Sequence, residues 1–329
     1  MRRILKGLGL VVAALAVVIA AMFVLGPYEP VDTEIAFDAA LVPDDVEGWL
    51  ADREGQVGDV DPEHTKRILW SGVPGARTDL AIVYVHGFSA TGWELRPVPD
   101  RLGEALDANV FITRLTGHGQ DGAALAEASA GDWFEDLAEA MAVGRALGDR
   151  VVVMATSTGA TLAAALAADP DLAALREGLA GLILVSPNFR VSNPAGALLS
   201  WPAARSWVPL VAGEIRSFAP QNDRHGRHWT TEYPTVALLP MQAAIDHATA
   251  LDYAAADLPA LFWFAPADAV VDHAATEAVA SAWGGPVTIE RVTVPDGDDP
   301  FAHVIAGDIL SPQGTQAAIP AMEAWLRGL

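Results

Sequence analysis

The feature that most constrains the fold is an alternation of short apolar runs with longer stretches rich in Ala and Leu. Most of the runs are apolar throughout, which is typical of parallel strands covered on both faces. Seven runs predict strands, at Lys66–Trp70, Leu80–Val85, Asn109–Arg114, Arg150–Ala155, Gly181–Val185, Leu261–Phe264 and Val287–Val294. Five of the longer stretches predict helices, at about Pro99–Leu106, Trp133–Leu147, Thr158–Ala168, Ala274–Trp283 and Gln313–Leu326. This alternation predicts an α/β fold with a mostly parallel sheet and helices on both of its faces.

Acidic residues outnumber basic ones, with 42 Asp and Glu against 20 Lys and Arg, and the formal net charge is −22. A nucleic-acid partner is excluded on this basis, because neutralising phosphates requires clustered Lys and Arg. The chain contains no cysteine, which excludes disulfides, thiolate-bound metals and thiol catalysis. A hydrophobic fraction of 52% is enough for a large core.

The N-terminus carries an uncharged apolar stretch, Gly7–Gly26, preceded by Arg2, Arg3 and Lys6. A helix of this length spans roughly 30 Å, the thickness of the hydrocarbon core of a bilayer. We therefore expect residues 1–26 to form a single transmembrane anchor in the inner membrane. The basic residues would stay in the cytoplasm and the body would lie on the periplasmic side. A cleaved signal peptide is the alternative, although the apolar stretch is longer than such peptides usually have.

About seventy residues separate the strand runs that end near Phe189 and begin near Leu261. This interval is rich in Pro and aromatic residues and is longer than a simple crossover requires. It predicts an inserted subdomain over residues 190–259, between core segments 27–189 and 260–329. The insertion is either a lid that lines an apolar pocket or the small core of a subdomain.

The loop after Arg150–Ala155 holds the candidate nucleophile, Ser157. A serine on a sharp strand-to-helix turn is lifted clear of the sheet, and the turn requires small residues two positions before and after it. Ala155 and Gly159 occupy those positions. The alternative is that Thr156 or Ser157 only caps the following helix.

Two further candidates follow predicted strands, in the order Ser…Asp…His that suits a catalytic triad. Asp268 comes after Leu261–Phe264, and His303 comes after the last predicted strand and before the last helix. Asp272 is a rival for the role of the acid. The nearby acidic run Asp296–Asp299 lacks the ligand spacing of a calcium loop, so we expect a solvated loop and no metal.

The body from about Leu80 to Pro312 resembles the α/β-hydrolase superfamily, in particular its esterase and monoacylglycerol-lipase-like branch. The resemblance implies a sheet of about eight strands with a helical lid after the sixth strand. It also implies that the backbone amides of Phe88 and Thr158 form the oxyanion hole, while His86 and His118 are structural. The segments that carry it are Val83–Thr91, Arg114–Gly122, Ala155–Ala163, Ala265–Asp272 and His303–Pro312.

Together these features predict a membrane-anchored serine hydrolase that needs no cofactor. It would cleave small-molecule or lipid esters, such as acylglycerols, through an acyl-enzyme on Ser157, with His303 as base and Asp268 as the orienting acid. Serine peptidases and acyltransferases use the same triad and remain alternatives. A non-catalytic binding module that kept the fold is the alternative from another class.

Overall fold

A computed structural model describes residues 2–329, apart from the side chains of residues 2–9, 11 and 15. Its centre is a seven-stranded sheet in the order β1-β3-β2-β4-β5-β8-β9. All neighbouring strands are parallel except β1 and β3, which are antiparallel. The strands are β1 (Arg67–Leu69), β2 (Thr78–Val85), β3 (Asn109–Ile112), β4 (Gly148–Thr156), β5 (Leu179–Val185), β8 (Ala260–Phe264) and β9 (Val287–Arg291).

Each of the seven apolar runs overlaps one of these strands, so the mostly parallel sheet is confirmed. The expectation of about eight strands was wrong, because the sheet has seven. That number came from the family resemblance, whereas the apolar runs themselves indicated seven.

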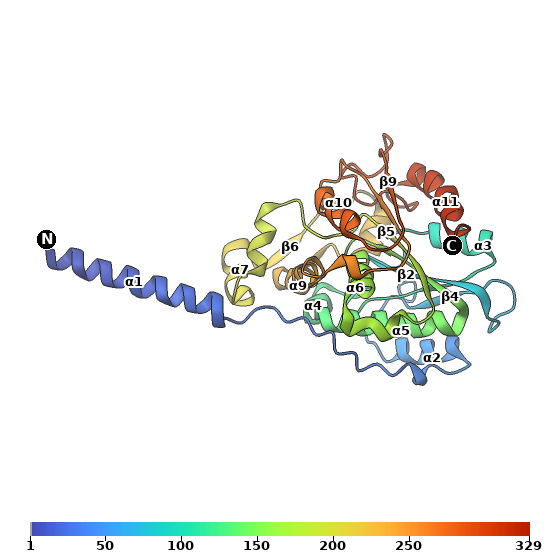
Figure 1. Cartoon of the computed structure of the whole chain (residues 1–329), viewed down its shortest axis with the longest axis horizontal. Coiled ribbons are helices and arrows are strands. Elements are labelled where there is room, and N and C mark those ends of the chain that lie inside the picture. Colours follow the sequence, from blue (N-terminus) through green and yellow to red (C-terminus); the bar gives the residue numbers. More distant parts are fainter. Residues whose placement is uncertain (1) are drawn as a thin grey trace.

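Helices cover both faces of the sheet (Figure 1). The five predicted helices are present, and others lie at the N-terminus, in connections and in the insertion. The helices are α1 (Arg2–Leu25), α2 (Val46–Gly55), α3 (Val98–Leu106), α4 (Gly122–Glu127), α5 (Ala130–Leu147), α6 (Thr158–Ala168), α7 (Ala204–Ala212), α8 (Asp223–His228), α9 (Leu238–Thr249), α10 (His273–Ala282) and α11 (Pro312–Leu326). Five 3₁₀ turns are η1 (Ala39–Leu41), η2 (Pro170–Arg176), η3 (Pro194–Ser200), η4 (Thr235–Ala237) and η5 (Tyr253–Ala255).

Strand β2 shows why both faces are covered. Successive side chains of a strand point to opposite faces. Ala81 and Val83 belong to the apolar cluster that contains residues of α5 and α6. Ile82 and Tyr84 belong to the cluster that contains residues of α3 and α11. Each fully buried aliphatic side chain stabilises the fold by about 1.5–3 kcal/mol, which explains the continuous apolar run.

The segment between β5 and β8 falls into two parts. Helix α9 packs against α5 and α6, so the end of the segment joins the helical layer over the sheet. Helix α7 packs instead on η3 and η4, and the two-stranded ribbon of β6 (Ile215–Ser217) and β7 (Glu232–Pro234) packs on α4 through β7. We call residues 190–237 the cap.

Helix α1 projects from the body, and the chain that follows it meets the cap (Figure 1). The rings of Phe23 and Trp201 lie 5.4 Å apart, and the Ala203 amide donates to the Pro27 carbonyl at 2.6 Å. Arg205 Nε lies 2.8 Å from Glu29 Oε2. Within the described part of the chain, no helix has both the length and the apolar character needed to cross a membrane. The transmembrane helix expected over residues 1–26 is therefore not found.

Candidate active site

Ser157 lies in the turn between β4 and α6, in a backbone conformation that side chains rarely adopt. Its φ is 52° and its ψ is −117°, a strained geometry that persists only where the surroundings fix it. The Ser157 amide donates to the Val185 carbonyl at 2.9 Å, and the Ser157 carbonyl accepts from the Asn188 amide at 3.2 Å. These bonds tie the turn to the end of β5, and the side chain is left free to point away from the sheet.

The small residues around Ser157 have a steric reason. A β-carbon at Gly159 would lie 2.5 Å from the carbonyl oxygens of both Val85 and His86, so only glycine fits there. Ala155 is completely buried. Ser157 occupies the N-cap position of α6 but makes no capping hydrogen bond with its side chain. The turn therefore presents the hydroxyl instead of capping the helix with it.

The structure brings Ser157, His303 and Asp268 together. His303 Nε2 lies 3.0 Å from Ser157 Oγ, and His303 Nδ1 lies 2.8 Å from Asp268 Oδ2. The other carboxylate oxygen of Asp268 accepts the amides of Val270 at 2.8 Å and Val271 at 2.9 Å. The Asp268 carboxylate is thus held in place, and it favours the tautomer of His303 that carries its proton on Nδ1. Nε2 is then free to accept the serine proton.

The rival acid, Asp272, has other partners. It occupies the N-cap position of α10 and accepts the Ala274 amide at 2.9 Å. Its second oxygen accepts from Arg190, with 2.7 Å between the guanidinium nitrogen and the carboxylate. Asp272 therefore begins the helix and does not contact His303.

His303 is held in an environment that favours its charged form. Burial opposes the charged form, but the Asp268 carboxylate beside it, with smaller contributions from Glu94 and Asp299, raises the pKa of His303 above its ordinary value. A base with this property takes up the serine proton readily near neutral pH.

The acidic run before His303 is only in part the solvated loop that the sequence predicts, since Asp296 and Gly297 are exposed. Asp298 and Asp299 are both buried. Asp299 Oδ2 accepts hydrogen bonds from the amides of His303 at 3.1 Å and Val304 at 3.0 Å. These two bonds hold the backbone of His303 in place. Asp298 accepts the Gly314 amide at 2.7 Å at the start of α11. Across the residues that the structure describes, no group of His, Asp or Glu could hold a metal ion.

The two candidate oxyanion donors belong to two segments that adjoin the nucleophile. Thr158 is the first residue of α6, and Phe88 follows Gly87 in the loop after β2. A β-carbon at Gly87 would lie 3.0 Å from Ser157 Cβ, so this loop runs directly against the nucleophile. His86 supports it: His86 Nε2 accepts the Leu115 amide at 3.1 Å, and burial holds the pKa of His86 well below its usual range.

The cap covers this site. The Thr230 amide donates to the Ser89 carbonyl at 2.7 Å, and the Tyr233 ring lies 5.4 Å from that of Phe88. Ser157 is only 6% exposed and His303 only 9%. The cap therefore packs against the loop after β2 beside a nucleophile that is itself buried.

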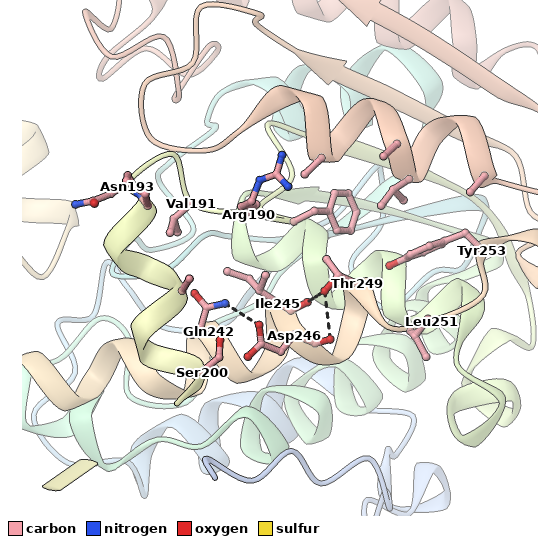
Figure 2. Close-up of a pocket in the computed structure, with 17 residues that line it drawn as sticks. Arg190, Val191, Asn193, Ser200, Gln242, Ile245, Asp246, Thr249, Leu251 and Tyr253 are labelled. Carbon is pink, nitrogen blue, oxygen red and sulfur yellow. Dashed lines mark hydrogen bonds between the residues drawn. The ribbon is translucent and has the colours of Figure 1, made fainter. Parts of the chain in front are cut away.

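A cavity of about 510 Å³ lies elsewhere, between η3, α9 and α10 (Figure 2). Gln242 and Asp246 line it and share a hydrogen bond of 2.8 Å, and Tyr253 closes its other end. Ser157, Asp268 and His303 do not line this cavity, so it is separate from the proposed reaction centre.

Sequence reasoning missed two buried acids beside the site, Asp299 and Glu94. The sequence places Asp299 in a solvated loop, because the acidic run Asp296–Asp299 lacks the ligand spacing of a calcium site. Glu94 lies outside every motif that was recognised, and a single glutamate carries no signal of burial.

The sheet, the strand-to-helix serine turn and the Ser–His–Asp hydrogen bonds have the arrangement of an α/β hydrolase. The chain belongs to the alpha/beta hydrolase family, whose sequence model matches residues 82–307. No curated protein matches the chain by sequence.

Solved structures show the same fold at low sequence identity. One of the two metagenome-derived lipolytic enzymes LipS and LipT is 19% identical, with a TM-score of 0.66 over 82% of this chain and 100% of that one. The monoacylglycerol lipase of Paleococcus ferrophilus is 13% identical, with a TM-score of 0.55 over 79% of this chain and 97% of that one. A soluble variant of the monoglyceride lipase of Saccharomyces cerevisiae, solved with a substrate analogue, is 13% identical, with a TM-score of 0.56 over 80% of this chain and 90% of that one. The resemblance to lipases and esterases of this superfamily is therefore confirmed at the level of the fold.

Proposed function

We propose that the protein is a serine esterase that cleaves lipid-like carboxylic esters without a cofactor. The observation that carries the proposal is the continuous hydrogen-bonded series from Ser157 Oγ through His303 to Asp268. It occurs at the strand ends of an α/β sheet, where such folds bind their ligands.

In the proposed reaction, Ser157 Oγ attacks the ester carbonyl while its proton passes to His303 Nε2. The carbonyl oxygen becomes an oxyanion that accepts hydrogen bonds from the amides of Phe88 and Thr158. When the C–O bond to the alcohol breaks, His303 returns its proton to the leaving alkoxide, and an acyl-Ser157 ester remains. Water then repeats the sequence: His303 takes its proton, hydroxide adds to the acyl carbon, and Ser157 leaves with the proton.

An ester with an apolar acyl group suits the residues around the nucleophile. Phe88 of the oxyanion loop and Tyr233 of the cap pack edge to face, and Trp229 joins a buried apolar cluster with Val304. Lipolytic enzymes and monoacylglycerol lipases among the structural neighbours support an acylglycerol or similar lipid ester as the substrate class.

Labelling with a fluorophosphonate probe tests the proposal. The wild type should be labelled, and the Ser157→Ala variant should not, since the probe reacts with an activated serine. A wild type that is folded but unlabelled would favour a binding module.

Substrate assays then distinguish the reactions that share the triad. Nitrophenyl esters of increasing chain length should be hydrolysed, whereas cleavage of amides alone would assign a peptidase. Ester formation with an added alcohol in place of hydrolysis would assign an acyltransferase.

We also propose that the segment Gly7–Gly26 attaches the body to the periplasmic side of the inner membrane. The support is its apolar sequence and the exposed apolar side chains of the adjacent cap, among them Leu210 and Val211. Alkaline extraction of membranes tests it: the full chain should stay in the membrane fraction. Release into the soluble fraction would contradict the attachment, and protection from external protease in spheroplasts would contradict the periplasmic location.

A further inference from the structure

The loop that would form half of the oxyanion hole is held from behind by a buried carboxyl group, that of Glu94. Glu94 is 2% exposed, and its Oε2 accepts the Gly87 amide at 2.7 Å and the Tyr84 hydroxyl at 3.3 Å. A β-carbon at Gly87 would lie 2.9 Å from Glu94 Oε1 and 3.0 Å from Ser157 Cβ. Only the width of one glycine therefore separates this acid from the nucleophile.

Burying the negative charge of a carboxylate costs free energy unless hydrogen-bond donors or a positive charge stabilise it. Gly87 and Tyr84 each contribute one donor, and in the described part of the chain no Lys or Arg forms an ion pair with Glu94. Arg96, two positions further along the chain, pairs with Asp100 instead. His303 is the group whose positive charge can compensate Glu94.

The electrostatic relation between Glu94 and His303 is mutual. Burial raises the pKa of Glu94 to about 7, and the charge of His303 opposes that rise. In turn, Glu94 adds to the effect of Asp268 in raising the pKa of His303. The groups that face His303 are therefore Asp268 from the loop after β8, Asp299 from its own loop and Glu94 from the segment after β2. Those that face Glu94 are Tyr84 of β2, the Gly87 amide and His303.

We propose that Glu94 is a positioning residue for the acyl transfer, on the premise that the proposed esterase function holds. Its carboxyl group fixes Gly87, and hence the Phe88 amide, beside Ser157. In its ionised form, the same group stabilises the imidazolium that forms on His303 when Ser157 gives up its proton. Glu94 takes no proton from the substrate and touches none of the reacting atoms.

Two substitutions separate these roles. Glu94→Gln keeps an oxygen that can accept the Gly87 amide but removes the charge. We expect the acid limb of its kcat/KM profile to move to lower pH, with KM nearly unchanged. Glu94→Leu removes both the acceptor and the charge, and we expect kcat to fall by about 10- to 100-fold, somewhat less than the loss of a whole oxyanion donor.

Glu54→Gln is the matched control, because Glu54 is also a buried acid but pairs with Arg114, with 2.8 Å between Oε2 and Nε. It should lower the melting temperature and leave the acid limb in place. The proposal is overturned if Glu94→Gln keeps the acid limb of the wild type. It is also overturned if folded Glu94→Leu keeps the wild-type kcat. If Glu94→Leu does not fold, the acid limb of the Glu94→Gln kcat/KM profile alone decides whether the proposal holds.

An NMR titration of the His303 ring gives a readout that does not need turnover. The His303 pKa should be lower in Glu94→Gln than in the wild type, while Glu54→Gln should match the wild type. If the protein hydrolyses no ester but this shift is present, the esterase proposal fails and the Glu94–His303 coupling stands. If esters are hydrolysed but the His303 pKa does not shift, the esterase proposal stands and the Glu94–His303 coupling fails.

Discussion

At the scale of single residues, the site depends on which carboxylate faces His303. Asp268 points at His303 Nδ1 and is fixed by two backbone amides, whereas Asp272 caps α10 and pairs with Arg190. Two acids only four positions apart thus have different tasks, and the structure gives Asp268 the contact with His303 that the sequence predicts for it.

Matched amide substitutions test this assignment. Asp268→Asn should lower kcat by about 10⁴-fold, the loss seen when a triad acid becomes an amide and the histidine takes the wrong tautomer. Asp272→Asn should keep kcat within a few-fold of the wild type, because its ion pair is largely exposed. Steady-state hydrolysis of a nitrophenyl ester by both variants makes the comparison. Equal losses would contradict the assignment.

At the scale of elements, the acidic loop between β9 and α11 joins helix stability to the geometry of the site. Asp298 accepts amides at the first turn of α11, and Asp299 accepts the amides of His303 and Val304. Neighbouring residues therefore support a helix and a catalytic loop separately.

We expect Asp298→Ala to affect stability alone and Asp299→Ala to affect both stability and catalysis. Asp298→Ala removes acceptors at a helix N-terminus, which should lower the free energy of unfolding by about 0.5–2 kcal/mol and leave kcat nearly unchanged. Asp299→Ala leaves the His303 amide unsatisfied, so both stability and kcat should fall. Urea unfolding and ester hydrolysis measure the two effects. A normal kcat in Asp299→Ala would show that the loop does not depend on that acid.

The elements were predictable to different degrees for physical reasons. The strands were predictable, because a strand that is covered on both faces must be apolar throughout, as Leu80–Val85 is. Helix α2 was not, because only three of its residues are buried and it carries no clear apolar face. The roles of Asp299 and Glu94 depend on their burial and on bonds to backbone amides in irregular loops, which a pattern of apolar and polar residues does not record. The positions of Ser157, Asp268 and His303 followed from strand ends meeting at one edge of the sheet.

At the scale of the whole molecule, charges from three separate segments converge on one imidazole. Asp268, Glu94 and Asp299 together raise the pKa of His303 against the effect of burial. The neutral ring is the form that accepts the serine proton, so activity is lost as the pH falls through the pKa of His303.

The pH profile of the wild type should therefore have its acid limb above pH 6.5, the ordinary value for histidine. The measurement is kcat/KM against pH with an uncharged ester, which reports the free enzyme. In Asp268→Asn the limb should move to lower pH, because the largest favourable charge is gone. A wild-type limb well below 6.5 would contradict the electrostatic account.

The cover over Ser157 has a kinetic consequence. Ser157 is only 6% exposed, and the Thr230 amide ties the cap to the Ser89 carbonyl, so we expect an ester to reach the hydroxyl only after the cap moves. Turnover then includes an opening step before any bond is made, and such steps limit many enzymes. Where opening is slowest, kcat becomes the same for esters whose intrinsic reactivities differ widely, and it falls as solvent viscosity rises.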